Sequence, residues 1–118
     1  MGIDPGAYSR KEIGRRLEAL REGMGLSQVE MVELCRSDSL EFTPQEWNNW
    51  ESGRQRPSAK KAILIADATG AGLDYIFRAI ESDLPARDGL ATRVKAYLAG
   101  KLEKLPRKRR KPENRRRA

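Results

Sequence analysis

A hydroxyl residue followed three positions later by a glutamate occurs three times in the first half of this sequence. The pattern stands at 9–12, at 27–30 and at 43–46, and each copy precedes apolar residues spaced three and four apart. A hydroxyl at a helix start accepts a free backbone N–H, while the glutamate reaches back to the N–H of the hydroxyl residue. Alternation with period two is almost absent. The chain is therefore predicted to fold into short helices.

Glycine, proline and apolar spacing indicate five such helices in about 70 residues. The second carries Met31, Leu34 and Cys35, of which Cys35 is expected to be half-buried, and the fifth turns Ile76 and Phe77 inward. Pro44 begins the third helix, where the missing N–H of proline costs nothing. The predicted helices cover residues 12–23, begin at 27, cover 44–52 and 58–69, and begin at 73.

The pattern changes beyond Ile80. A sixth helix is predicted from Leu90, because Leu90, Val94, Leu98, Leu102 and Leu105 repeat mostly every four residues. This stripe either folds back on the five helices or pairs with another chain. The predicted organisation is a flexible N-terminal arm over 1–8, a helical domain over 9–80, a linker and amphipathic helix over 81–105, and a disordered basic tail over 106–118.

Composition argues against catalysis. The chain has no histidine, which removes the commonest general base and the commonest zinc ligand. No phosphate-binding glycine motif is present, so we expect no catalytic residue, no metal site and no cofactor. The single cysteine, Cys35, fits a reducing cytoplasm, and neither a signal peptide nor a membrane span is expected.

The net charge of +7 is unevenly distributed. Residues 101–118 hold ten Lys or Arg against two Glu, a net +8, which leaves −1 for the first hundred residues. Basic runs bind polyanions without reading sequence, and such binding weakens steeply with salt. The tail is expected to bind nucleic-acid phosphates, the alternative being a solubilising end.

The third predicted helix separates two kinds of side chain. Trp47 and Trp50 share one face, whereas Gln45, Asn48 and Asn49 share the opposite one. Side-chain amides can bond N6 and N7 of adenine with two bonds at once. The tryptophans are therefore expected to anchor the helix in the core, and the amides form a candidate reading surface.

The order and spacing of four segments resemble the Cro/repressor-type (Xre-like) helix-turn-helix family of phage and bacterial transcription regulators. The segments are IGRRLEALR from 13, GLSQ at 25–28, WESGRQRP at 50–57 and SAKKAILIADATG at 58–70. The resemblance implies an all-α, compact five-helix lambda-repressor-like helix-turn-helix domain. The sixth helix and the disordered basic tail would be additions to it.

The resemblance also implies roles for single residues. Gln28 would contact the DNA backbone, and the helix from Thr43 to Asn49 would enter the major groove. Arg21 and Glu51 would form a partly buried salt bridge. Lys60 joins the set because a cation in the first turn of a helix is disfavoured unless it finds a phosphate. The expected DNA-binding residues are Gln28, Thr43, Pro44, Gln45, Asn48, Asn49, Arg54, Arg56 and Lys60.

The turn before the recognition helix departs from the family. The stretch from Ser27 to Trp50 is several residues longer than usual, and the excess falls in CRSDSLEF at 35–42. Val32 stands where the family favours alanine. Thr43 and Phe42 predict that the helix still starts at its cap. The insertion leaves the docking angle of the helix open.

Two classes of function follow. The first is a sequence-specific double-stranded DNA-binding regulator, a repressor of bacterial or phage type, acting as a homodimer through residues 90–105. The second is a protein-interaction module, antitoxin-like or a phage assembly factor, whose 90–105 stripe binds a partner protein. RNA binding through the tail ranks lower, because the sequence shows no aromatic stacking platform.

Overall fold

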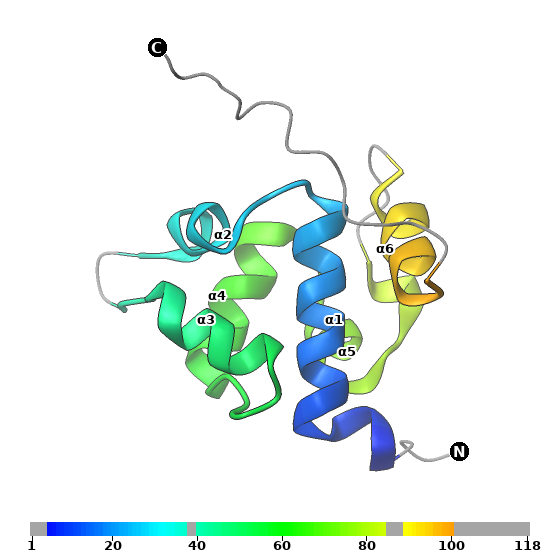
Figure 1. Cartoon of the computed structure of the whole chain (residues 1–118), viewed down its shortest axis with the longest axis horizontal. Coiled ribbons are helices and arrows are strands. Elements are labelled where there is room, and N and C mark those ends of the chain that lie inside the picture. The colour runs from blue at the N-terminus through cyan, green and yellow to red at the C-terminus, as the bar shows by residue number, and fades with distance from the viewer. Residues whose placement is uncertain (1–4, 38–39, 85–88, 101–118) are drawn as a thin grey trace.

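The computed structural model describes residues 5–37, 40–84 and 89–100 (Figure 1). Within these residues the fold is all-α, and the single β-like feature is an isolated bridge between Ser37 and Leu40. The predicted five helices plus a sixth are confirmed. In order the elements are η1 Pro5–Tyr8, α1 Arg10–Gly23, α2 Gln28–Cys35, α3 Pro44–Glu51, α4 Ala59–Thr69, α5 Leu73–Arg78, η2 Glu81–Asp83 and α6 Leu90–Leu98.

Two of the three predicted capping boxes are complete. Ser27 caps α2 and Thr43 caps α3, and in both the glutamate accepts the N–H of the capping residue in return. The first box is half formed. Ser9 Oγ accepts the N–H of Glu12 at 3.2 Å, but the Glu12 carboxylate lies 3.7 Å from the Arg15 guanidinium. A nearby cation thus competes for the glutamate that would close the box.

Helix α1 stands in the middle of the molecule, with α2, α3 and α4 on one side and α6 on the other (Figure 1). It contacts α3, α5 and α6, while α2 contacts α3 and α4. Burial of large apolar side chains from every α-helix stabilises this arrangement. The core includes Leu17, Leu20, Met31, Trp47, Ile65, Tyr75, Ile76 and Val94.

The buried face of α2 differs from the predicted one. Met31 is buried, and Cys35, expected to be half-buried, is only 3% exposed, whereas Leu34 is 45% exposed and Val32 lies in the core. Helix α2 packs on both α3 and α4, and its buried face, made by Met31, Val32 and Cys35, is centred on Cys35. By the helical repeat, Val32 lies within this face, whereas Leu34 lies beyond its edge and is exposed.

Helix α6 folds back on α1, the first of the two arrangements expected for its apolar stripe. Leu90 and Val94 are buried in the common core. Tyr97 donates its hydroxyl hydrogen to Glu18 at 2.8 Å, and Arg93 Nε donates to the carbonyl of Gly23 at 2.7 Å. Leu90 and Val94 are thus unavailable to a second chain. The remaining stripe residues Leu102 and Leu105 lie outside the described residues.

The segment before α1 is more ordered than predicted. Residues 5–8, expected to belong to a flexible arm, form η1, which contacts α1 and α5. The Tyr8 ring packs at 6.0 Å from that of Phe77. Residues 1–4 lie outside the described part. None of the described helices is both long and apolar enough to span a bilayer.

Candidate nucleic-acid interface

Helix α3 is fixed in place by its two tryptophans. Trp47 is fully buried and Trp50 nearly so, with ring centroids 5.6 Å apart in an edge-to-face arrangement. Phe42, from the end of the extended turn, packs edge-on against Trp50 at 5.7 Å. An aromatic side chain of the inserted segment therefore fills space beside the helix. Trp47 and Trp50 are core anchors, as expected.

Glycine at position 14 lets α3 approach α1 closely. A Cβ atom there would lie 2.3 Å from the carbonyl oxygen of Trp50 and 2.7 Å from that of Glu51. No side chain fits such a gap, because these neighbours are backbone atoms of a packed helix. Any larger residue at this position would push the C-terminal turn of α3 away from α1.

Glu51 joins α3 to α1 and α2. Its carboxylate accepts two hydrogen bonds from Arg21, Nε at 2.6 Å and Nη2 at 3.1 Å. Gln28 Nε2 donates to it at 2.9 Å, and so does the indole N–H of Trp47. Burial opposes the charge of Arg21, but the hydrogen bond and the negative charge of Glu51 outweigh it, so the pKa of Arg21 is raised. This pair occupies the positions that the resemblance assigned to a salt bridge.

The outward face of α3 carries a second, more exposed network. Asn49 Oδ1 accepts from Arg54 Nη1 at 2.6 Å and from Gln45 Nε2 at 3.1 Å. Asn48 Oδ1 lies 3.5 Å from Gln28 Nε2. The structure thus gathers five of the predicted site residues on one surface built from α2, α3 and the loop after α3. We call Gln28, Gln45, Asn48, Asn49 and Arg54 the amide face.

The remaining predicted residues lie around this face or apart from it. Thr43 and Pro44 are exposed at the N-terminus of α3. Arg56 stacks its guanidinium over the Tyr8 ring, 4.7 Å from the centroid. Lys60 lines a separate hollow with Ser37, Leu40, Ile63 and Leu64.

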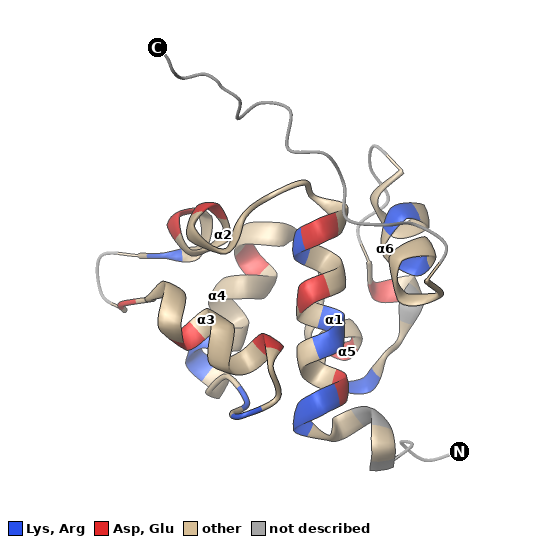
Figure 2. Ribbon diagram, in the orientation of Figure 1, with Lys and Arg blue, Asp and Glu red and all other residues tan. Residues whose placement is uncertain are grey.

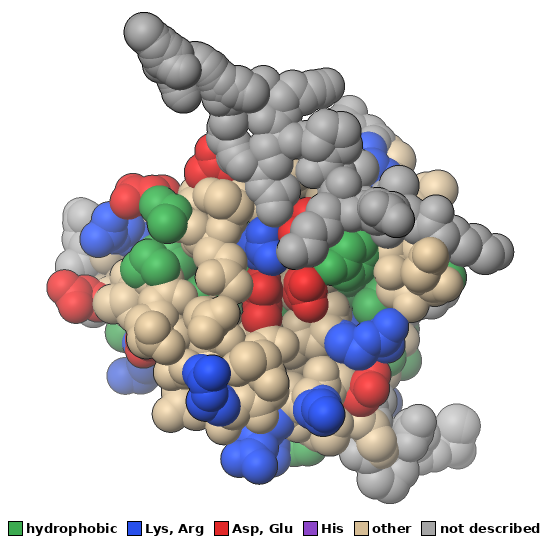
Figure 3. Space-filling view, viewed as in Figure 1, with side chains coloured by type: hydrophobic (Ala, Val, Ile, Leu, Met, Phe, Trp, Pro, Cys, Tyr) green, Lys and Arg blue, Asp and Glu red, His purple; other side chains and the backbone are tan. Residues whose placement is uncertain are grey.

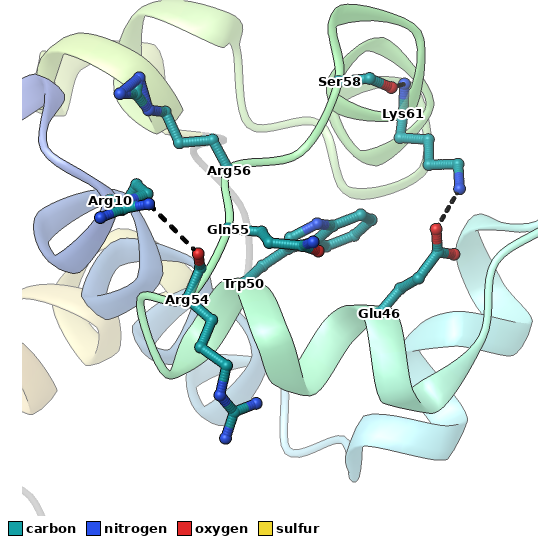
Figure 4. A pocket seen from close by; sticks show the side chains of 8 residues that line it. All are labelled: Arg10, Glu46, Trp50, Arg54, Gln55, Arg56, Ser58 and Lys61. Atoms are coloured by element: carbon teal, nitrogen blue, oxygen red, sulfur yellow. Dashed lines mark hydrogen bonds and ion pairs between the residues drawn. The ribbon is translucent and has the colours of Figure 1, made fainter.

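An open hollow of about 490 Å³ lies between the start of α4 and the loop that follows α3 (Figure 4). Arg10 and Arg56 line this hollow on its α1 side, where the Arg56 side chain turns away from Lys61, and Arg10 Nη1 lies 3.4 Å from the carbonyl oxygen of Arg54. The Arg54 side chain itself runs away from the hollow, toward the outer side of α3. Lys61, on the far side, is paired with Glu46. Ser58, the cap of α4, opens onto the same space.

Six of the eight residues that line this hollow were not predicted as DNA-binding residues, and Arg10 and Gln55 are two of them. Arg10 is 44 positions from Arg54 in sequence, so only the fold brings them together. Gln55 N–H shares the carbonyl of Asn49 with Arg54 N–H, at 3.2 and 3.0 Å. The sequence signal for both residues was a basic neighbour and a nearby helix start, and such positions are common on protein surfaces.

Charges of both signs are interspersed over the described surface. Figure 2 shows both signs along α1, only acidic segments on α2 and α3 and only basic ones on α6, and Figure 3 shows basic side chains as separate patches along the lower edge of this view. This distribution matches the near-zero charge of the first hundred residues. A partner of this face would therefore be recognised through hydrogen bonds and a few placed cations, without a broad positive field.

Comparison with known proteins agrees with this geometry. A family model described as "Helix-turn-helix domain" matches residues 12–75. An uncharacterised HTH-type transcriptional regulator of Rickettsia conorii is 30% identical over 69 residues, covering 58% of this chain and 51% of the relative. A protein of the same description from Rickettsia prowazekii is also 30% identical, with 58% and 49% covered. The chain thus spans about half the length of these relatives. No solved structure matches with comparable significance.

Proposed function

The chain belongs to the helix-turn-helix domain family, and on that premise we propose that it is a transcriptional regulator that binds specific double-stranded DNA sequences. Helix α3 would enter the major groove with the amide face toward the base edges. The Rickettsia relatives, described as HTH-type transcriptional regulators, support this proposal. We further propose a bacterial or phage repressor of the Xre-like type, acting in the cytoplasm by occupying its site.

The division of α3 into two faces carries the proposal. One face is buried through Trp47 and Trp50, while Gln45, Asn48 and Asn49 remain at the surface. Amide side chains can both donate to and accept from base edges in the major groove. A short helix that is locked by aromatic residues on one side and lined by amides on the other suits recognition of DNA better than it suits a purely structural role.

Gln28, at the edge of the amide face, and residues around that face would bind the DNA backbone. Gln28 lies at the first position of α2, where free backbone N–H groups also point outward. Arg10 and Arg56 would hold a phosphate near the hollow at the start of α4. Such contacts set the position of the protein on the duplex and carry no sequence information. Lys60 would contact a more distant phosphate.

Domain organisation and assembly complete the proposal. Residues 9–80 would form the DNA-binding domain, and 81–105 a linker and helix that brace it. Two copies would bind two half-sites about one helical turn apart. If the copies meet through residues 90–105, the contact must use surfaces of α6 other than Leu90 and Val94, which α1 already covers.

Selection of duplexes from a random library by the full chain tests the proposal. The experiment is run at roughly 0.15 M salt, where sequence-independent binding to phosphates is weakened. We expect one enriched site, with two related half-sites. Enrichment of no site would contradict the proposal. A stable complex with a partner protein together with no enriched site would favour the protein-interaction alternative.

A further inference from the structure

The orientation of the Asn49 amide is determined by its partner. Arg54 Nη1 lies 2.6 Å from the atom assigned as Asn49 Oδ1, and Gln45 Nε2 lies 3.1 Å from it. Guanidinium nitrogens only donate hydrogen bonds, so the amide atom facing Arg54 has to be the oxygen. The donor group of Asn49, Nδ2, is consequently the one left for a ligand.

The backbone holds Arg54 over Asn49 as well. The N–H groups of Arg54 and Gln55 both donate to the carbonyl of Asn49, and Ser52 Oγ donates to it at 3.2 Å. Gly53 has a φ of 85°, a left-handed conformation that glycine adopts without strain and that turns the chain back over α3. The contact between Arg54 and Asn49 is therefore built into the turn that ends the helix.

An amide in this state has lost the ability to read adenine in the usual way. Adenine offers N7 as an acceptor and N6–H as a donor, so a bidentate amide needs its oxygen free. Asn49 Oδ1 already accepts two bonds. Guanine offers two acceptors, O6 and N7, and these match the Nδ2–H groups of Asn49 and the remaining N–H groups of Arg54.

We propose that Asn49 and Arg54 act as one donor-only reading group that selects guanine over adenine in the major groove. This inference rests on the proposed DNA-binding function and specifies the base that one part of the site must contain. It revises the expectation that all amides of α3 suit adenine. Gln45 is different, because it uses one N–H for Asn49 and retains Oε1 and a second N–H. Gln45 can still pair with adenine.

Two substitutions separate the parts of this reading group. Asn49→Asp keeps an oxygen facing Arg54 but removes both Nδ2 donors. Arg54→Met removes the guanidinium and frees one lone pair of Asn49 Oδ1, which restores an acceptor beside the Nδ2 donors. Thr92→Ala, on the exposed side of α6, is the matched control. Circular dichroism and thermal unfolding verify that each variant is folded.

The test is selection from a random duplex library with the full chain and these variants, followed by affinity measurements on the selected site. The wild type and Thr92→Ala are expected to require guanine at one position of each half-site. Asn49→Asp should lose that preference, with affinity falling between about fivefold and a hundredfold. Arg54→Met should move the preference at the same position toward adenine. Replacing the guanine by 7-deazaguanine, which lacks N7, should weaken wild-type binding.

The outcomes distinguish this inference from the function on which it rests. An enriched wild-type site with adenine at the position sensitive to Asn49→Asp would overturn the inference and leave DNA binding intact. The same holds if a guanine preference survives both substitutions unchanged. Failure of the wild type to enrich any site would overturn the proposed function itself.

Discussion

Glu51 receives hydrogen bonds from side chains of α1, α2 and its own helix. Its side chain is 7% exposed and that of Arg21 is 5% exposed, so both charges have left water. A buried pair of this kind adds little over an apolar pair of the same shape. Glu22 also lies 3.3 Å from Arg21, so loss of Glu51 would leave Arg21 one carboxylate but would remove the acceptor that Arg21 shares with Gln28 and Trp47. The pair thus makes the docking of α3 intolerant of substitution.

The substitution Glu51→Ala should lower the free energy of unfolding by at least about 1–3 kcal/mol, because the part-buried donors of Arg21, Gln28 and Trp47 would lose the acceptor that they share. Urea denaturation followed by tryptophan fluorescence measures this. Glu33→Ala, which breaks an exposed pair with Arg36, should change stability by less than about 1 kcal/mol. Equal effects of the two substitutions would contradict the account of Glu51.

Cys35 contributes to stability as a neutral, buried side chain. It is 3% exposed, and burial raises the pKa of its thiol from the ordinary 9.0 to about 12. Below pH 9 the thiol is protonated in both the folded and the unfolded protein. Between pH 9 and 12 only the unfolded protein ionises it, so this contribution to stability is lost as the pH rises.

The wild type should therefore lose more stability between pH 8 and 10.5 than Cys35→Val, which keeps an apolar side chain and cannot ionise. Urea midpoints at both pH values measure the difference. Tyr97, whose pKa is raised by burial and by its hydrogen bond to Glu18, titrates in both proteins and cancels in the comparison. Identical pH dependence in the two proteins would show that the thiol ionises as easily when folded as when unfolded.

At the scale of elements, helices α6 and α3 lie on opposite sides of α1 (Figure 1). Leu90 and Val94 place α6 in the common core, and hydrogen bonds from Arg93 and Tyr97 fix both of its ends. Under the proposed function, the contribution of α6 to stability should consequently be separable from recognition of DNA by α3.

The substitution Leu90→Ala should destabilise the protein by about 2–5 kcal/mol through the cavity that it leaves. The specific binding of the protein that remains folded should be unchanged. Thermal unfolding and a titration with the selected duplex, both compared with Thr92→Ala, test the two statements. A loss of specificity at full folding would mean that α6 takes part in recognition.

How far each element could be predicted depends on whether its signal is local. The caps at Ser27 and Thr43, the glycine breaks and the spacing of Trp47 and Trp50 are local, and the corresponding helices were predicted well. The exposure of Leu34 was not predicted, because it depends on α2 packing against two helices at once. The contact of Arg54 with Asn49 needs a specific turn after Gly53, and no periodicity indicates it.

At the scale of the whole molecule, the net positive charge is concentrated in one part of the chain. The first hundred residues carry a net charge of −1, while residues 101–118 carry +8. A DNA-binding domain without a strong positive field would attract DNA phosphates only weakly. We propose that the basic tail, which lies outside the described residues, supplies sequence-independent attraction to DNA.

Truncation of residues 106–118 should weaken binding to specific and scrambled duplexes by the same factor. The plot of log affinity against log salt should become less steep by roughly one for each phosphate that the shortened chain no longer neutralises. Titrations of the full and truncated chains at several salt concentrations measure both quantities. An unchanged salt dependence would remove the tail from the binding account.

The central claim is that the outward face of α3 reads the DNA. The most direct test is the ratio of the dissociation constants for a scrambled and a selected duplex, measured for the wild type and for the double variant Gln45→Ala/Asn49→Ala. Both positions are at the surface, so the fold should persist. We predict that the ratio falls by at least about tenfold while affinity for the scrambled duplex is unchanged. A ratio that stays at the wild-type value in the folded double variant would contradict the claim.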